Sequence, residues 1–336
     1  MAVSMLSRPL SGARLQCRAC AHACVLPPGA TGRCGVRRHR DGRLELSVYG
    51  YLSAVHVDPV EKKPLYHFCP GRAILSVGTV GCNLRCAWCQ NWSLSQQHAP
   101  SGPGRRLSPR QLVDFCRGEG LDLLAFTYNE PGVLLEYARD TALLAAEAGV
   151  RCALVTNGFF TPEALAALTP GLAAANVDLK AWRDETYRHF CGGRLKPVLR
   201  TIERLAATAS VWLEVTTLLV PGVNDSDEEL GAIARWLAAL SPDLPWHVSG
   251  FHPDYQMLDR SPTSVEALRR AWRLGREAGL RFVYTGNVWD PGPGSDTACP
   301  GCGAVVLERR LYELSAAWHE PGVCHQCGQR LAGVWT

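Results

Sequence analysis

The sequence predicts an α/β protein that folds as a partial or complete (β/α) barrel, with a cysteine-rich segment at each end of the chain. Three observations support this fold class. Short apolar runs recur along the chain, helix-start signals lie between them, and cysteines cluster before, within and after the repeat. Alternating strands and helices are typical of a parallel sheet covered by helices. A doubly wound open sheet shows the same alternation and is the alternative.

The apolar runs are the expected strands. Most are too continuous for a half-exposed strand, which indicates strands buried on both faces of a sheet. They are Ala73–Val77, Leu123–Thr127, Cys152–Val155, Ala175–Leu179, Val211–Leu219, His247–Gly250 and Phe282–Tyr284. Helices are expected between them, because a serine or threonine followed by proline, or by glutamate three residues later, marks a helix start. These pairs are Ser108-Pro109, Thr161-Pro162, Ser226 with Glu229, and Thr263 with Glu266.

Bulk composition limits the class of protein and its partners. The 336 residues are 47% hydrophobic and 20% charged, which is ordinary for a globular chain with one large domain and appendages. The net charge of +4 is too small to indicate nucleic acid as a partner, and Arg37–Arg40 is expected to form a solvated turn between strands. Neither a signal peptide nor a membrane span is recognisable, so we expect a cytoplasmic protein that binds no membrane.

The 15 cysteines are the unusual feature of the composition. Disulfides are rare in the cytoplasm, so these residues are expected to be metal ligands, nucleophiles or small buried side chains. The C-terminal group, Cys299, Cys302, Cys324 and Cys327, forms two C-x2-C pairs that each end in glycine, as in a zinc ribbon. Four thiolates close a tetrahedral site, so zinc bound there is expected to be structural.

The N-terminal group, Cys17, Cys20, Cys24 and Cys34, has the spacing C-x2-C-x3-C-x9-C, and His22 could replace one thiolate. Four thiolates can bind zinc or an iron–sulfur cluster, and the spacing does not separate the two. We favour structural zinc and keep a second cluster as the alternative.

The cysteine groups and the strand repeat predict three regions: residues 1–70 with this metal site, a barrel over 71–290, and the zinc-ribbon-like segment over 291–336.

The middle group has three cysteines, in the pattern Cys82-x3-Cys86-x2-Cys89. Three thiolates leave one iron of a cubane [4Fe–4S] cluster without a protein ligand, and an open metal position is what catalysis needs. A zinc site completed by a distant histidine is the alternative. The three cysteines follow the first expected strand, and active sites of barrels lie at the C-terminal ends of the strands.

Further polar residues lie at the ends of the later strands. Turn formation explains the glycine, proline and asparagine found there, but it does not require Glu130, Lys180 or His252. The segments are Tyr128-Asn129-Glu130-Pro131, Thr156-Asn157-Gly158, Asp178-Leu179-Lys180, Glu214 with Thr216 and Thr217, and His252-Pro253. We expect them to face the three cysteines across one end of the barrel.

Together these motifs resemble the radical S-adenosylmethionine (radical SAM) superfamily, whose cluster motif matches Cys82-x3-Cys86-x2-Cys89 with Trp88 at the aromatic position. Within it, the chain resembles the radical enzymes of the AmmeMemoRadiSam system, which are related to pyruvate formate-lyase activating enzymes. This likeness rests on the N-terminal Cys-x2-Cys-x-His-x-Cys, on Asp58–Phe68 and Thr127–Pro131, and on the C-terminal cysteine pairs. It implies a TIM-like partial (β/α)6 barrel.

The resemblance also implies a chemistry. A [4Fe–4S] cluster on the three cysteines would bind S-adenosylmethionine (SAM) and cleave it reductively to a 5′-deoxyadenosyl radical, which abstracts hydrogen from a substrate. The implied cofactor contacts are Trp88 and Gln90 at the adenine, Asn129 and Glu130 at the methionine amino group, Lys180 at the carboxylate, Asp178 or Asn157 at the ribose, and His252. Activating enzymes usually carry Gly-Gly-Glu where this chain has Tyr128-Asn129-Glu130, so the backbone can approach the cofactor differently.

Three functional hypotheses follow. The first is a radical enzyme of the AmmeMemoRadiSam type that acts on an unidentified substrate or partner protein. The second is an activating enzyme that places a glycyl radical on a partner. The third is a zinc-stabilised binding module without catalysis. For the enzymatic hypotheses the expected partners are a low-potential ferredoxin or flavodoxin as electron donor, and AMMECR-like and MEMO-like proteins.

Overall fold

A computed structural model describes residues 2–98, 100, 104–288, 294–310 and 313–336. The boundary expected between residues 290 and 291 lies outside these ranges. Within them, the central sheet has the strand order β16-β15-β14-β13-β12-β11-β9-β8. Its strands are β8 (Ala54–Pro59), β9 (Ala73–Gly78), β11 (Leu123–Phe126), β12 (Arg151–Thr156), β13 (Leu172–Asp178), β14 (Trp212–Leu219), β15 (Trp246–Gly250) and β16 (Val283–Gly286).

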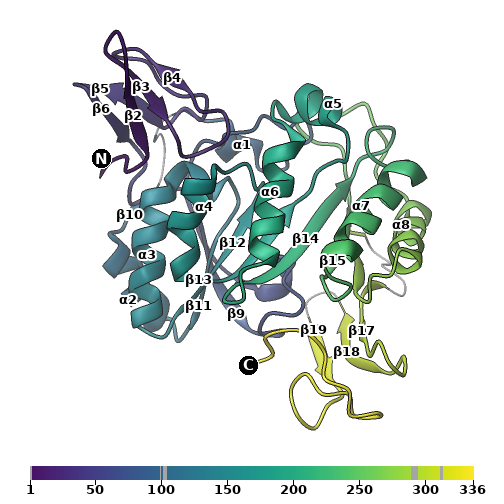
Figure 1. Cartoon of the computed structure of the whole chain (residues 1–336). Helices are drawn as coiled ribbons and strands as arrows, with labels where there is room; N and C mark the ends of the chain where they lie inside the picture. Colours follow the sequence, from purple (N-terminus) through teal and green to yellow (C-terminus); the bar gives the residue numbers. More distant parts are fainter. Residues whose placement is uncertain (1, 99, 101–103, 289–293, 311–312) are drawn as a thin grey trace.

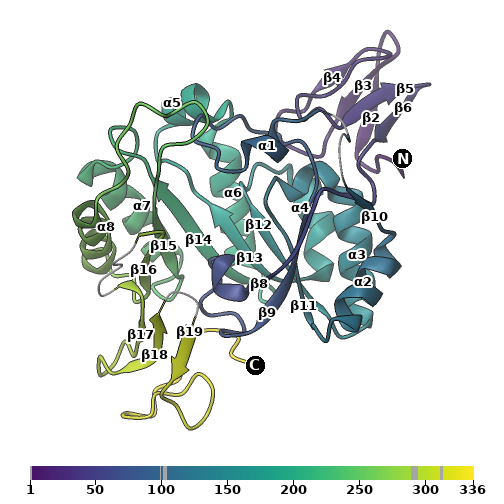
Figure 2. The same ribbon diagram turned by 180° about the vertical axis from the view of Figure 1, so that it is seen from behind.

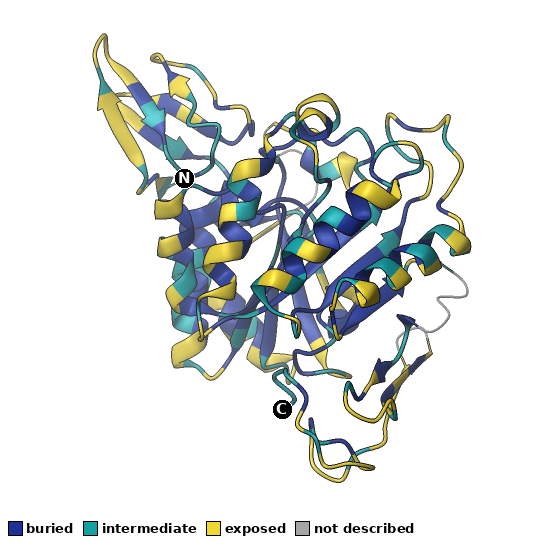
Figure 3. Ribbon diagram, turned by 45° about the vertical axis from the view of Figure 1, so that its right-hand side comes forward, coloured by how far each residue is buried: buried dark blue, intermediate teal, exposed yellow. Residues whose placement is uncertain are grey.

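The sheet confirms the barrel class. Strands β9 and β11 to β16 are parallel and stand in chain order, whereas a doubly wound sheet reverses its strand order part-way. In the part of the chain that is described, the first and last strands do not pair with each other, so the barrel is partial. The strands are almost fully buried, which explains why their sequences are continuous apolar runs (Figure 3).

The longer helices cover one face of this sheet (Figures 1 and 2). The helices are α1 (Trp92–Ser95), α2 (Pro109–Gly118), α3 (Leu135–Glu147), α4 (Pro162–Leu168), α5 (Asp184–Thr186), α6 (Leu195–Ala206), α7 (Asp227–Leu240) and α8 (Val265–Glu277). Ser108, Thr161 and Ser226 cap helices α2, α4 and α7 as expected. The expectation for Thr263 was wrong by one residue, because Ser264 caps α8 and Thr263 instead donates a hydrogen bond to the Leu219 carbonyl.

Strand β8 was missed by the sequence analysis. It pairs antiparallel with β9, so the sheet extends into the residues that we assigned to the N-terminal region. Its side chains are partly exposed, with His56 and Val57 facing solvent, and it therefore lacks the continuous apolar signal of the other strands. The remaining short segments near it are β7 (Tyr51–Leu52), paired with β10 (Arg105–Arg106), and the 3-10 turn η1 (Val60–Lys62).

The N-terminal region forms small antiparallel sheets beside the barrel (Figure 1). One contains β1 (Ala2–Val3), β6 (Arg43–Leu46) and β5 (Arg37–Arg40); the other contains β2 (Ser7–Leu10), β3 (Arg14–Cys17) and β4 (Val25–Leu26). The prediction of a solvated turn at Arg37–Arg40 was wrong, because these residues form β5. Arg37 is buried and pairs with Glu136 of α3 at 2.6 Å, an interaction with a partner 99 residues away.

The C-terminal segment lies at the opposite end of the barrel from the N-terminal sheets (Figure 1). It contains β17 (Thr297–Ala298), β18 (Val305–Arg310) and β19 (Glu313–Ala316). His67 joins it to the barrel, because its imidazole hydrogen-bonds the Ala332 carbonyl and the Tyr284 hydroxyl, both at 2.6 Å. Helices that could cross a bilayer are absent from the described residues.

Candidate functional site

The three cysteines of the middle group lie on one loop, residues 81–90, called the cysteine loop below. It follows the C-terminal end of β9, where a barrel places its active site. Gly81 adopts a φ of +86°, and a Cβ there would lie 2.5 Å from the Cys34 carbonyl oxygen of the N-terminal region. Glycine is therefore required at this position by both conformation and space.

Loops that follow two other strands fix the course of the cysteine loop. The amides of Arg85 and Ala87 donate to the carbonyls of Cys191 and Phe190, both at 2.8 Å, in the π-helical turn η4 (Tyr187–Cys191) after β13. The amide of Gln256, after β15, donates to the Ala87 carbonyl at 3.1 Å. Because backbone atoms make these bonds, the loop is positioned independently of its own side chains.

The thiols of the cysteine loop are surrounded by donors that suit metal-bound sulfur. The Leu84 amide lies 3.4 Å from the Cys82 sulfur, and the Asn157 side-chain amide lies 3.8 Å from it. The Ser95 hydroxyl lies 3.1 Å from the Cys89 sulfur. Burial raises the pKa of the Cys82 and Cys89 thiols, so a bound cation is needed to hold them as thiolates at neutral pH. The donor set of one buried and two partly buried thiols therefore fits a [4Fe–4S] cluster with one open iron.

Asn129 and Glu130, at the end of β11, hold the surrounding backbone. The Asn129 side chain donates to the Gly81 carbonyl at 2.7 Å and accepts from the Thr79 amide at 3.1 Å. The Glu130 carboxylate accepts from the Asn157 and Gly132 amides, both at 2.8 Å, and from the Thr156 hydroxyl. Burial raises the pKa of Glu130 to about 7 although these bonds oppose the shift. Both side chains thus join the cysteine loop to the ends of β11 and β12.

Tyr128 stands where the resemblance to activating enzymes expects a glycine. It adopts a φ of +70°, the left-handed conformation that glycine favours. Its hydroxyl donates to Asp58 of β8 at 2.7 Å, and the Lys63 ammonium lies 4.7 Å from its ring centroid. Contacts with the strand that the sequence analysis missed thus hold a glycine-like turn without a glycine.

The ends of β12 and β13 bring further expected cofactor residues to the cysteine loop. The Asn157 side-chain amide donates to the Asn83 side-chain oxygen at 2.8 Å. Lys180 pairs with Asp178 at 3.0 Å. Burial opposes the charged form of Lys180, yet Asp178, Cys86 and Cys191 together raise its pKa well above the ordinary value. Lys180 is therefore a fixed cation beside Cys86.

The last expected contacts involve two residues of the cysteine loop itself, Trp88 and Gln90, together with His252. The Gln90 side chain and His252, after β15, are 3.0 Å apart. Trp88 is buried, with its ring centroid 5.9 Å from that of Phe190. The structure therefore gathers Trp88, Gln90, Asn129, Glu130, Asn157, Asp178, Lys180 and His252 around one loop. Their individual contacts with a cofactor stay predictions.

Two residues behave differently from the sequence analysis. Cys191, which lies outside the three cysteine groups of the sequence, hydrogen-bonds Cys86, and this contact lowers the pKa of Cys86. An isolated cysteine in a loop carries no local signal that could have revealed this contact. Glu214 is not at the cysteine loop: it accepts from the His67 amide at 2.8 Å and pairs with His247 at 2.6 Å. These contacts join Glu214, on β14, to His67, which also binds the Ala332 carbonyl of the C-terminal segment.

The C-terminal cysteines form a compact group. The sulfurs of Cys299, Cys302, Cys324 and Cys327 all lie within 4.8 Å of one another, with two pairs at 3.6 Å. Four sulfurs bound tetrahedrally to one zinc ion at 2.3 Å would lie about 3.8 Å apart. This group can therefore hold a single metal ion with little rearrangement.

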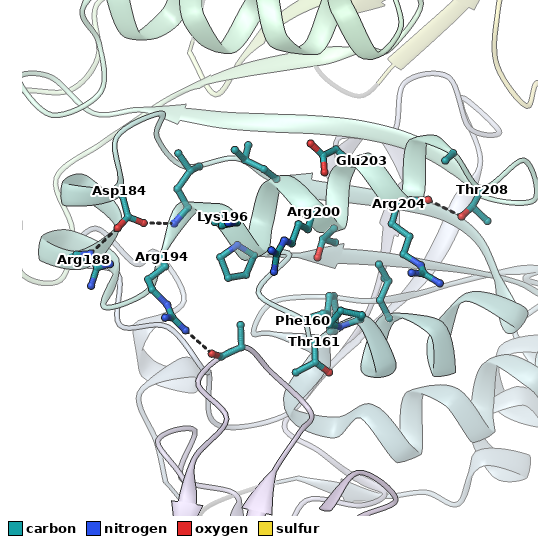
Figure 4. Close-up of a pocket in the computed structure, with 18 residues that line it drawn as sticks. Phe160, Thr161, Asp184, Arg188, Arg194, Lys196, Arg200, Glu203, Arg204 and Thr208 are labelled. Atoms are coloured by element: carbon teal, nitrogen blue, oxygen red, sulfur yellow. Dashed lines mark hydrogen bonds and ion pairs between the residues drawn. The ribbon is translucent and has the colours of Figure 1, made fainter.

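A large groove lies outside the barrel, between α4, α6 and the N-terminal region (Figure 4). This basic groove has a volume of about 1150 Å³. The charged residues that line it are Arg188, Arg194, Lys196, Arg200 and Arg204, with Asp184 and Glu203. Arg194 donates to the Ala21 carbonyl at 2.9 Å, which joins the groove to the N-terminal cysteine segment.

Comparisons with known proteins agree with this geometry. Residues 76–237 match the family model described as the radical SAM superfamily. An uncharacterized protein of Methanocaldococcus jannaschii is 36% identical over 335 residues, which cover 98% of this chain and 99% of the relative. The GTP 3′,8-cyclase of Chlorobaculum tepidum is 26% identical over 154 residues, or 44% of this chain and 45% of that enzyme.

A solved structure shares the fold over the barrel. Streptococcus suis SuiB bound to S-adenosylmethionine superimposes with a TM-score of 0.52 and 11% identity, covering 68% of this chain and 53% of SuiB. At this identity the likeness concerns the fold alone. It agrees with the partial barrel.

Proposed function

The chain belongs to the radical SAM superfamily, and from this premise we propose that it generates a 5′-deoxyadenosyl radical at a [4Fe–4S] cluster held by Cys82, Cys86 and Cys89. When bound and reduced, such a cluster supplies the electron that cleaves SAM to methionine and this radical. The observation that carries the proposal is the gathering of eight cofactor-binding candidates at the cysteine loop, of which Trp88 and Gln90 belong to the loop itself. The other six come from the C-terminal ends of β11, β12, β13 and β15, as expected for a barrel active site.

The side chains divide into two proposed roles. Lys180, a fixed cation beside Cys86, would pair with the carboxylate of the methionine moiety, and Asp178 or Asn157 would bind the ribose hydroxyls. Trp88, Gln90 and His252 would border the adenine. Glu130 and Asn129 already bind backbone groups of the cysteine loop and the β12 turn, so we propose that they act mainly by positioning these elements.

The substrate is unidentified, and the proposal concerns the reaction type. We propose hydrogen abstraction within a system of the AmmeMemoRadiSam kind, with AMMECR-like and MEMO-like proteins as candidate partners. The resemblance in the N-terminal cysteines and in Asp58–Phe68 supports this assignment. Activation of a glycyl-radical enzyme is the second candidate function, since the Asn157, Lys180 and His252 segments resemble those of activating enzymes. Zinc in the C-terminal group is proposed from its compact sulfur arrangement.

We further propose that the electron donor is a low-potential ferredoxin or flavodoxin that docks at the basic groove. Such donors are commonly acidic, and the groove presents Arg200 and Arg204 on α6 among its exposed cations. The groove also borders the chain that holds the cysteine loop, because Arg188 belongs to η4 and the carbonyls of Phe190 and Cys191 bind that loop. Opposite charges at this face would speed and orient docking.

The test is SAM cleavage by the anoxic, iron-reconstituted protein. With dithionite and SAM, we expect 5′-deoxyadenosine, measured by mass spectrometry. Cys86→Ala is expected to abolish both the cluster and this product. Cys116→Ala is the matched control, since Cys116 is a buried cysteine on α2 that hydrogen-bonds the Leu121 and Leu123 carbonyls. Absence of 5′-deoxyadenosine from the cluster-loaded wild type would reject both enzymatic hypotheses and leave the binding module.

A further inference from the structure

The N-terminal cysteines surround a small enclosed space. Cys17, Cys20, Cys24 and Cys34 line it together with Arg37 of β5 and Asn83 of the cysteine loop. The four thiols therefore form one site, although 16 residues lie between the first and the last.

This site is wider than a single-ion site. Among the described residues, the C-terminal four cysteines are the one group of metal-ligand type whose ligand atoms all lie within 4.8 Å of one another. The N-terminal four do not meet this limit, and neither do Cys82, Cys86 and Cys89. In a cubane cluster each thiolate binds a different iron, so its sulfurs stand farther apart than on one zinc ion. The N-terminal site thus resembles the cysteine loop and differs from the C-terminal site.

Two buried donors that line the same space lack acceptors. The Arg37 Nε and the Asn83 Nδ2 are shielded from solvent and have no hydrogen-bond partner among the described residues. The side chain of Arg37 is 2% exposed, and Asn83 is 1% exposed. An unpaired buried donor costs about 1–3 kcal/mol, so an acceptor is expected in this space. The sulfides and thiolates of an iron–sulfur cluster are acceptors for such N–H groups.

The site adjoins the cysteine loop directly. Asn83 follows Cys82 in the chain and lines the N-terminal space. The His22 imidazole, between Cys20 and Cys24, lies 2.7 Å from the Asn83 carbonyl oxygen. The Cys34 carbonyl approaches Gly81 so closely that no Cβ fits there. Asn83 therefore adjoins both cysteine sites, and the two sites lie close together, as electron exchange between two metal centres requires.

We propose that Cys17, Cys20, Cys24 and Cys34 bind a second [4Fe–4S] cluster that passes electrons to the catalytic one. This replaces the structural zinc that we favoured from the sequence. The electron-transfer role rests on the proposed function, whereas the presence of the cluster does not. In each transfer a reduced ferredoxin or flavodoxin loses one electron, the second cluster gains and then loses it, and the catalytic cluster gains it. No bond forms or breaks in these steps.

The test separates the two clusters by mutation. In the full chain carrying Cys82→Ala, Cys86→Ala and Cys89→Ala, reconstituted without oxygen, we expect about four iron and four sulfide per chain, the content of one cubane. After dithionite reduction, its electron paramagnetic resonance signal is expected to be unchanged by SAM, because all four irons have protein ligands. The wild type is expected to hold about twice this iron, with part of its signal sensitive to SAM.

A second variant tests the same site from the other side. Cys17→Ser with Cys20→Ser is expected to lose about half of the iron and to retain 5′-deoxyadenosine formation with dithionite, while losing it with a protein donor. If this variant fails to fold, the iron content of the triple variant still decides. An iron-free triple variant that binds two zinc ions per chain would overturn the inference. Iron in the triple variant without 5′-deoxyadenosine from the wild type would reject the proposed function alone.

Discussion

The N-terminal and C-terminal cysteine sites have the same number of thiols and different surroundings. The C-terminal thiols form a tight group on a segment at the end of the barrel opposite the N-terminal sheets. The N-terminal thiols are spread around a buried space that borders the cysteine loop and contains unpaired N–H donors. A count of cysteines is therefore a weak guide to the metal. The spacing of the sulfurs and the neighbouring donors separate a structural ion from a cluster beside an active site.

Loss of the C-terminal metal should have the largest effect on stability. Structural zinc contributes about 10 kcal/mol or more of binding free energy in small zinc-finger peptides. Cys324→Ser is therefore expected to release this metal and to lower the thermal midpoint strongly, with iron content unchanged. Calorimetry and metal analysis check this, with Ser315→Ala on β19 as the control. A variant as stable as the wild type would show that the compact group has no structural role.

Arg37 tests whether the N-terminal region depends on its contact with the barrel. Arg37→Gln leaves the buried Glu136 carboxylate without its cation, and breaking such a pair costs about 3–5 kcal/mol. We expect lower stability in urea and a loss of iron from the N-terminal site, with C-terminal zinc retained. Arg38→Gln is the matched control, because Arg38 is the exposed neighbour on the same strand. Equal effects of the two substitutions would contradict this account.

The pH dependence of stability tests the burial of His67 between the barrel and the C-terminal segment. Burial lowers the pKa of His67 to about 4 from an ordinary value near 6.5, so the folded protein holds this side chain neutral. As pH falls from 6.5 towards 4, His67 becomes protonated in the unfolded chain but stays neutral in the folded chain. This group therefore removes up to about 3 kcal/mol of unfolding free energy across that window.

Removing the titrating group should flatten this dependence. In His67→Gln, the unfolding free energy measured by denaturant titration is expected to fall less between pH 6.5 and pH 4.5 than in the wild type. The difference between the two slopes is the readout, because acid also weakens thiolate–metal bonds in both proteins. Parallel slopes would show that His67 is accessible to protons in the folded state.

The smallest effect is expected at the basic groove. Arg200→Glu combined with Arg204→Glu should slow SAM cleavage driven by an acidic protein donor by about tenfold at low salt, and less at high salt. Turnover with dithionite should not change. Arg110→Glu, at an exposed position on α2, is the control for net charge. An equal loss with dithionite would mean that the substitutions damage the enzyme and not the docking surface.

Local patterns were sufficient for most of the fold. Strands buried on both faces leave continuous apolar runs, and all seven expected runs became parallel strands. Strand β8 was not predicted because two of its six residues are exposed and two are partly exposed, so its sequence is not a continuous apolar run. The burial of Arg37 was not predicted for a different reason. Its partner Glu136 lies 99 residues away, and no local pattern shows that distant carboxylate.

The site was predictable to the extent that it lies at strand ends. The expected cofactor residues meet at the cysteine loop because parallel strands end at the same edge of a sheet. Two features were not predictable. The contact of Cys191 with Cys86 depends on the π-helical turn η4. The hydrogen bond from the Asn157 amide to the Glu130 carboxylate depends on the turn after β12. Both arise from the tertiary packing of loops.

The most direct test of the difference between the two four-cysteine sites is anomalous diffraction from anoxic crystals of the full chain. Data collected at the iron and zinc absorption edges locate each metal. We expect iron at Cys82, Cys86 and Cys89 and at the N-terminal four cysteines, and zinc at the C-terminal four. Zinc at both four-cysteine sites, with iron confined to the cysteine loop, would contradict the account.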